Sequence, residues 1–293
     1  MPYYVTEDHC RLYYETRGRG RPVVLIHGLT ANQRHFRKQI PELARHFEVV
    51  TFDLRGHGDS DVPEQGLTIP RLARDLKELL DYLELDRPSL IGWSLGGHVA
   101  FDYIRQYSCS SLEKLVVIDM APRLMKADDW AYGLPGVISR RSGDFGHEDN
   151  LLMLAAMLEN WEAYSRIVAQ RVLNKSLYNE KLEFNHQADF KGKDDLPWLY
   201  EEARRNTPHV IVALWVALMR QDYRPLLREI NIPTLLTYGE ESNYYPPETY
   251  AWMKTQIPDA VVAAFPGCGH ALHIQDGDRF NRMVIDFLGS RML

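Results

Sequence analysis

Residues Gly92-Trp93-Ser94-Leu95-Gly96 have the types and spacing to support nucleophilic catalysis. A Gly-x-Ser-x-Gly sequence between a strand and a helix makes a turn so tight that the serine takes a strained backbone conformation. The apolar run at residues 89–91 precedes the motif, and an amphipathic stretch over residues 97–107 follows it. Such a turn lifts the Ser94 hydroxyl above the end of a sheet and points the Leu95 N–H at a developing oxyanion. The motif therefore predicts an activated serine with an oxyanion donor beside it.

His270 is the candidate general base for this serine. A serine hydroxyl is a weak nucleophile unless an imidazole takes its proton during attack. His270 follows the glycine-rich residues 267–269, which come after the apolar run at 261–265. A histidine in such a loop can reach over the edge of a sheet.

Three other histidines lie close to the motifs and receive structural roles. We expect His27 to shape the oxyanion turn, His57 to lie in a surface turn and His98 to pack inside the protein. The pair His270 and His273 could suggest a metal site, but no further ligands accompany it, so no metal is predicted.

Apolar runs that alternate with amphipathic stretches must position these side chains. Parallel strands buried on both faces are continuously apolar, whereas surface helices have an apolar stripe. The pattern predicts a hairpin at the N-terminus and then strands alternating with helices, hence an α/β fold with a mostly parallel sheet and helices on both faces. The expected strands are residues 3–5, 11–15, 23–26, 49–52, 89–91, 115–118, 234–238 and 261–265.

The alternation stops between about residues 122 and 225. This stretch has helical periodicity and contains Trp130, Trp161 and Trp215, but no convincing strand. We expect a helical cap at 122–225 inserted into a core domain made of residues 1–121 and 226–293. The apolar side chains of the cap suggest a hydrophobic substrate pocket; they are Trp130, Tyr132, Met153, Met157, Trp161 and Trp215.

Composition restricts the partners and the compartment. The chain has 293 residues, is 45% hydrophobic, and carries a net charge of -6. Without a basic run, nucleic acid and anionic membranes are not expected partners. The three cysteines are widely spaced and the first eight residues do not resemble a signal peptide, which favours the cytoplasm. The apolar stretch at 210–219 is too short to span a bilayer.

These motifs together resemble the α/β-hydrolases with a helical cap, of the esterase and haloperoxidase-like branch. The resemblance covers the chain outside the insertion; its pieces are His27-Gly28, residues 53–60, 92–97 and 232–239, and Gly269-His270. It implies a mostly parallel, twisted sheet, Ser94 as nucleophile and His270 as base. It also implies an oxyanion hole formed by the N–H groups of Leu29 and Leu95, and it calls for no cofactor.

The sequence departs from this family at the third member of the catalytic triad, the acid that orients the histidine base. Its usual place is an aspartate after the penultimate strand, where this chain has Ser242, which cannot act as an acid. Some members of the fold carry the acid one strand earlier, and Asp119 stands there. We therefore expect Asp119 to be the acid, with Glu240 and Glu241 as alternatives and Ser242 as a supporting hydrogen-bonding group.

These residues predict a serine hydrolase that cleaves a small apolar carboxylic ester or lactone through an acyl-enzyme. Hydrolysis of a C–C bond beside a ketone uses the same triad and stays an alternative. Epoxide hydrolase and dehalogenase chemistry is disfavoured, because it needs a carboxylate where Ser94 stands. A ligand receptor on a hydrolase scaffold is the alternative from another class. The sequence does not define the oligomeric state.

Overall fold

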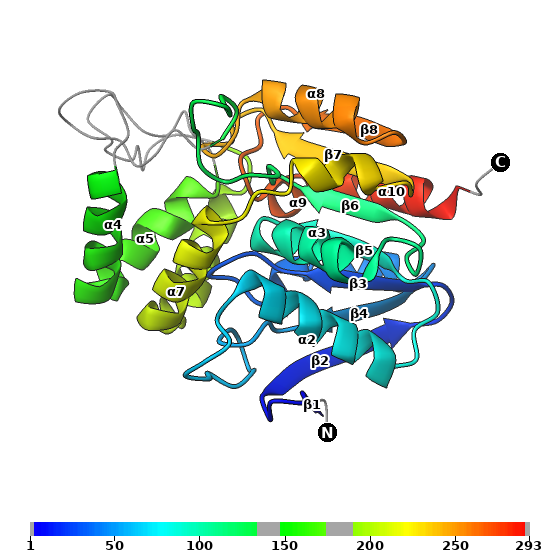
Figure 1. Ribbon diagram of the computed structural model, residues 1–293, viewed down its shortest axis with the longest axis horizontal. Helices are drawn as coiled ribbons and strands as arrows, with labels where there is room; N and C mark the ends of the chain where they lie inside the picture. Colours follow the sequence, from blue (N-terminus) through cyan, green and yellow to red (C-terminus); the bar gives the residue numbers. More distant parts are fainter. Residues whose placement is uncertain (1–2, 134–146, 174–189, 291–293) are drawn as a thin grey trace.

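The core of the protein is an eight-stranded sheet (Figure 1). The computed structural model describes residues 3–133, 147–173 and 190–290. The strands lie in the order β1-β2-β4-β3-β5-β6-β7-β8, and only the pairs β1–β2 and β2–β4 in this sheet are antiparallel. The strands are β1 (Tyr3–Val5), β2 (Arg11–Gly18), β3 (Pro22–Ile26), β4 (Glu48–Phe52), β5 (Ser89–Trp93), β6 (Leu115–Ile118), β7 (Thr234–Gly239) and β8 (Ala260–Phe265).

Helices cover both faces of the sheet, which explains the continuously apolar strands. Successive side chains of a strand point to opposite faces, so Val24 and Ile26 join one buried cluster while Val23 and Leu25 join another. The first cluster is covered by α2 (Ile69–Tyr82), α3 (Leu95–Tyr107) and α8 (Pro247–Gln256). The second is covered by α1 (Ile40–Leu43), α9 (Leu272–Gln275) and α10 (Gly277–Gly289). The predicted fold class is confirmed.

A long helical segment separates the paired strands β6 and β7. Leu115 of β6 pairs with Thr234 of β7, although the whole segment lies between these two strands in the sequence. Within the described part of this segment the helices are α4 (His147–Glu159), α5 (Trp161–Arg171), α6 (Leu196–Arg204) and α7 (Pro208–Met219), with 3-10 turns η3 (Lys193–Asp195) and η4 (Pro225–Glu229). Figure 1 shows α4, α5 and α7 grouped beside one end of the sheet.

The two ends of this segment meet at the sheet. The Tyr223 N–H donates to the Pro122 carbonyl at 2.8 Å, and Arg123 and Asp222 form an isolated bridge. This contact lies close to the predicted limits of 122 and 225. The division into a core and a cap domain stays a prediction, because the contact marks only where the segment leaves and rejoins the core.

The structure extends the predicted elements and adds some that the sequence did not suggest. The N-terminal hairpin is present, with β2 reaching Gly18. Helix α8 was not predicted, because its sequence alternates polar and aromatic residues without a clear stripe. A further 3-10 turn, η1 (Gln33–Phe36), follows β3. No helix in the described residues is long and apolar enough to cross a membrane.

Candidate active site

Ser94 sits on a strained turn between β5 and α3. Its φ of 54° and ψ of -120° lie in a region that L-residues seldom adopt. A Cβ at Gly92 would lie 2.4 Å from the Gly96 carbonyl oxygen, and a Cβ at Gly96 would lie 2.1 Å from that of Ile26. Both glycines are therefore needed for the turn to pack against β3 and α3. The strand–turn–helix expected from the sequence motif is present.

Asp119 follows β6 directly and is fully buried. Its Oδ2 lies 2.7 Å from His270 Nδ1 and accepts a hydrogen bond from Ser242 Oγ at 2.6 Å. Its Oδ1 accepts a short hydrogen bond from the Tyr250 hydroxyl. Because Nδ1 of His270 faces this carboxylate, the proton belongs on Nδ1 and Nε2 is left as the basic nitrogen.

Aromatic side chains hold the His270 ring and backbone. The Tyr244 ring stacks on the imidazole with ring centres 4.0 Å apart and planes 26° apart. The Trp93 indole Nε1–H donates to the His270 carbonyl at 2.9 Å. His270 is thus fixed by the residue before Ser94 and by the loop that follows β7.

The tyrosines around Asp119 remain hydrogen-bond donors. Burial and the neighbouring Asp119 carboxylate raise the pKa of Tyr250 well above 10, and burial raises that of Tyr244. The hydroxyl of Tyr250 therefore stays protonated throughout the physiological range and keeps donating to Asp119.

The predicted oxyanion donors come from two sides of Ser94. Leu95 is the first residue of α3, so its N–H has no acceptor within the helix. Leu29 follows Gly28, where a Cβ would lie only 3.1 Å from the Ser94 Cβ. The chain at Gly28–Leu29 therefore runs directly beside the serine.

His27 supports the turn that leads to Leu29. Its Nε2 accepts from the Leu54 N–H at 2.9 Å, and its Nδ1 lies 2.8 Å from the Gly28 carbonyl. Burial holds the pKa of His27 well below its usual value, so the ring is neutral and Nδ1 can donate to Gly28. This contact agrees with the turn-shaping role expected for His27.

The alternative acids Glu240 and Glu241 lie directly after β7. The backbone N–H groups of Glu240 and Glu241 donate to the carbonyls of Phe265 and Cys268, while the His270 Nδ1 partner is Asp119. Glu240 is exposed and Glu241 half-buried. The two residues thus join the β7 end to the loop that carries His270.

The expectation that His57 lies in a surface turn is wrong. Its side chain is 2% exposed because residues 53–60 fold back under the oxyanion turn, and the rings of His57 and His27 lie 5.2 Å apart. His98 is buried as expected, with Nε2 2.8 Å from the Ala121 carbonyl. His273 is also buried, against Trp93. Across the described ranges, no three His, Cys, Asp or Glu side chains are grouped as a metal site requires.

Two of the aromatic residues around the site were missed by sequence reasoning. Tyr244 and Tyr250 belong to no motif, and their positions depend on how α8 packs against β7. No local signal in the sequence identifies either tyrosine as part of the site.

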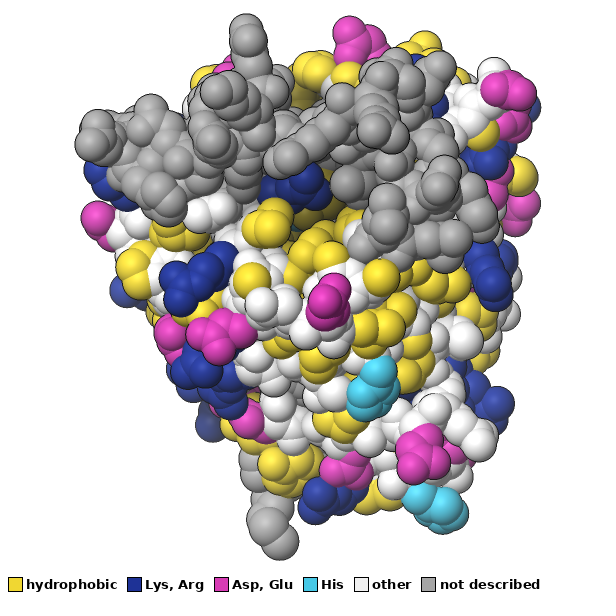
Figure 2. Space-filling view, turned by 90° about the vertical axis from the view of Figure 1, so that its left-hand side faces the viewer, with side chains coloured by type: hydrophobic (Ala, Val, Ile, Leu, Met, Phe, Trp, Pro, Cys, Tyr) yellow, Lys and Arg dark blue, Asp and Glu magenta, His cyan; other side chains and the backbone are white. Residues whose placement is uncertain are grey.

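The apolar side chains expected over the site form two clusters. Met153, Met157 and Trp161 pack together, with Leu29 and Trp215 against them. Trp130 packs against Tyr132 and against Trp252 of α8, and the expectation that these side chains line one pocket stays a prediction. Figure 2 shows hydrophobic side chains gathered on the face that carries the helical segment. Leu29, the predicted oxyanion donor, therefore contacts an apolar surface supplied by α4, α5 and α7.

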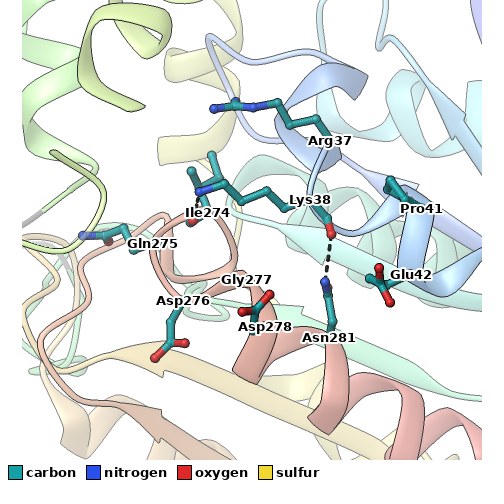
Figure 3. Close-up of a pocket in the computed structure, with 10 residues that line it drawn as sticks. All are labelled: Arg37, Lys38, Pro41, Glu42, Ile274, Gln275, Asp276, Gly277, Asp278 and Asn281. Atoms are coloured by element: carbon teal, nitrogen blue, oxygen red, sulfur yellow. Dashed lines mark hydrogen bonds between the residues drawn. The ribbon is translucent and has the colours of Figure 1, made fainter. Parts of the chain in front are cut away.

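A separate surface pocket of about 400 Å³ lies between the start of α1 and α10. Figure 3 shows Arg37 and Lys38 on one wall and Asp276, Asp278 and Asn281 on the other. The Asn281 side chain donates to the Lys38 carbonyl at 2.8 Å across it. Its walls do not include Ser94, Asp119 or His270, so it is separate from the candidate active site.

Comparison with known proteins identifies the fold and the family. The sequence profile of the α/β hydrolase fold matches residues 21–277. An α/β hydrolase superfamily protein of Bacillus subtilis is 28% identical over 293 residues, covering 99% of this chain and 100% of the relative. A pimeloyl-[acyl-carrier protein] methyl ester esterase of Nitrosospira multiformis is 28% identical over 281 residues, covering 94% and 97%. The crystal structure of a bromoperoxidase from Bacillus anthracis superposes with a TM-score of 0.83 at 26% identity, covering 97% of each chain.

The chain belongs to the α/β hydrolase fold family. Esterase and bromoperoxidase relatives agree with the branch that the motifs indicated. The protein is therefore a hydrolase of this superfamily.

Proposed function

We propose that the protein is a serine hydrolase of small apolar carboxylic esters or lactones, with Ser94, His270 and Asp119 as its triad. The observation that carries the proposal is the hydrogen bond of 2.7 Å between His270 Nδ1 and Asp119 Oδ2. It joins the loops after β8 and β6 at the sheet end where the strained Ser94 turn stands.

In this reaction Ser94 Oγ attacks the acyl carbon and His270 Nε2 takes its proton. The imidazolium is stabilised by Asp119, and the tetrahedral oxyanion by the N–H groups of Leu29 and Leu95. The tetrahedral intermediate expels the alcohol, which receives the proton from His270. Water, activated by the same histidine, then attacks the acyl-enzyme and releases the acid.

We further propose that residues 122–225 act as a cap that selects the substrate. The apolar cluster around Leu29 supports this, because an acyl chain bound at the oxyanion donors would contact it. A methyl ester esterase among the relatives is consistent with ester hydrolysis. The cytoplasmic location expected from the sequence stays a prediction.

A fluorophosphonate probe tests the nucleophile, because only an activated hydroxyl reacts with it at an appreciable rate. Unsubstituted protein is expected to be labelled at Ser94 and to hydrolyse short p-nitrophenyl esters. Ser94→Ala should abolish both, while Ser110→Ala, at an exposed serine, should change neither. Labelling that persists in Ser94→Ala, or maps to Ser60 or Ser242, would contradict the assignment.

A substrate panel then separates the alternatives. Esters and lactones of graded acyl length should be turned over, with shorter apolar chains preferred. Turnover of a diketone by C–C cleavage without ester hydrolysis would favour the C–C hydrolase. Saturable binding of ligands without any turnover would favour a receptor.

A further inference from the structure

Helix α6 lies along the chain segment that follows the oxyanion residue Leu29. Asp195 is the N-cap of α6 (Leu196–Arg204), Glu202 lies in its last turn, and Asn206 follows its C-cap; their spacings of seven and four residues bring the three side chains to one side of the helix. We call this face the α6 clamp. Each of its three side chains bonds to a residue between 30 and 38, so the helix and the segment run in opposite directions.

The first contact of the α6 clamp is a shared carboxylate. Asp195, which is 8% exposed, accepts from Arg37 Nη2 at 2.5 Å and from Lys38 Nζ at 2.8 Å. The Arg37 guanidinium also lies 3.5 Å from the centre of the Trp198 ring on α6. Two cations thus hold the start of α6 against the chain after η1.

The second contact lies in the last turn of α6. Glu202 is 7% exposed, accepts a short hydrogen bond from the Asn32 amide and pairs with Arg34 Nη2 at 3.1 Å. The Asn32 side chain also caps η1 by accepting from the Arg34 N–H at 3.0 Å. Glu202 therefore orients the residue that begins η1.

The third contact reaches the oxyanion turn itself. Asn206, 9% exposed, donates from Nδ2 to the Thr30 carbonyl at 2.8 Å and to the Ala203 carbonyl at 2.9 Å. Thr30 is the residue directly after Leu29. A side chain from the inserted segment thus binds the backbone next to the predicted oxyanion donor.

Thr30 needs such support because its backbone is strained. Its φ is +64°, in the left-handed region that β-branched residues avoid. Its hydroxyl donates to the Leu29 carbonyl at 2.5 Å, and the Ala31 N–H donates to the Gly28 carbonyl at 3.3 Å. Asn206 supplies the contact that fixes the Thr30 carbonyl from outside the turn.

We propose that the α6 clamp holds the oxyanion turn in its reactive geometry, with Asn206 as the positioning residue that acts through the Thr30 carbonyl. The inference rests on the proposed function of Leu29. If the oxyanion turn is displaced, the Leu29 N–H moves away from the oxyanion. Helix α6 would thus contribute to transition-state stabilisation, in addition to the substrate selection proposed for the cap.

The test compares Asn206→Ala and Asn206→Asp with a control on the same helix, Tyr200→Phe. Tyr200 donates to Glu162 of α5 at 3.2 Å and does not belong to the α6 clamp. The readouts are kcat and KM for a p-nitrophenyl ester and the inhibition constant of a trifluoromethyl ketone. This ketone forms a tetrahedral anion on serine and so reports directly on the oxyanion donors.

The Asn206 variants should lower kcat about 10- to 100-fold and leave KM within about twofold. They should raise the inhibition constant of the ketone by the same factor as the loss of kcat. Tyr200→Phe should change neither. Asn206 also caps α6, so its replacement can destabilise the helix. Glu202→Gln is therefore a second variant, because glutamine keeps the shape of the glutamate side chain. It should lower both kcat and the affinity for the ketone, by a smaller factor. Loss of thermal stability with unchanged kcat per active site and unchanged ketone affinity would overturn the inference. An unsubstituted protein without turnover or ketone binding would instead overturn the proposed function, and the inference with it.

Discussion

Asp119 accepts hydrogen bonds from three side chains, which fixes both oxygens of its carboxylate. Oδ2 is shared by His270 and Ser242, and Oδ1 is bound by Tyr250. A carboxylate held in this way cannot rotate to follow the imidazole, so the imidazole must be oriented by it. Its proposed role as the acid depends on this fixed geometry.

Replacing the carboxylate tests that role. Asp119→Asn should lower kcat by up to about 10⁴, by analogy with the aspartate of serine-protease triads, because the amide cannot stabilise the imidazolium. Glu240→Gln and Glu241→Gln should leave kcat nearly unchanged. Steady-state kinetics with a p-nitrophenyl ester, alongside circular dichroism to check folding, gives the comparison. If a change at either glutamate removes activity while Asp119→Asn keeps it, the acid lies after β7.

The candidate residues could be predicted because each stands at the end of an apolar run. Ser94, Asp119 and His270 follow strands whose patterns are legible, and parallel strands bring their carboxyl ends to one edge of a sheet. Tyr244 and Tyr250 could not be predicted in this way. Their contacts depend on the path of the chain between β7 and α8, which no local pattern encodes.

At the scale of elements, the neighbouring strands β6 and β7 each end at a position that could carry the triad acid. Ser242 Oγ after β7 lies 2.6 Å from Asp119 Oδ2 after β6. A carboxylate at position 242 would thus stand within reach of the space that the Asp119 carboxylate occupies. We therefore expect that either strand end can support the proposed acid.

A double substitution tests this interchange. Asp119→Asn/Ser242→Asp should recover about tenfold or more of the kcat lost in Asp119→Asn, equal to roughly 1.4 kcal/mol of barrier. The matched control Asp119→Asn/Ser242→Asn adds the same bulk without charge and should recover nothing. Equal kcat values for the two double variants would show that position 242 cannot support His270.

A helix or strand could be predicted from the sequence where its burial requires a regular pattern of apolar residues. The strands at 23–26 and 115–118 are buried on both faces, so their apolar runs are unbroken and their limits were predicted to within a residue. Helix α8 buries Thr249, Tyr250 and Met253, a set that forms no continuous apolar stripe. Its helical character comes from tertiary contacts, which a single sequence does not reveal.

At the scale of the whole molecule, buried neutral histidines make stability depend on pH. Burial lowers the pKa of five histidines, to about 3 for His35 and about 4 for His57 and His98; the others are His27 and His273. Each is protonated in the unfolded chain below about pH 6.5 but stays neutral in the folded protein. Their stabilising contribution is therefore complete above that pH and is lost as pH falls.

The free energy of unfolding should fall between pH 7 and 5.5, by on the order of 1 kcal/mol for each histidine. Asp53 and Asp75 act in the opposite direction because burial raises their pKa values, that of Asp53 to about 6, and so offset part of the loss. Urea denaturation at the two pH values measures the difference. His98→Gln should reduce the dependence, and a pH-independent midpoint would contradict the prediction.

The pairing of β6 with β7 has a consequence for the order of folding. The two strands can join only after roughly a hundred intervening residues have been looped out, and closing such a loop slows folding more than it reduces stability. Asp119 ends the first of these strands, whereas His270 comes after the strand beyond the second. A newly made chain can therefore collapse around its N-terminal strands before the proposed triad partners Asp119 and His270 meet, so we expect hydrolytic competence to be the last property it acquires.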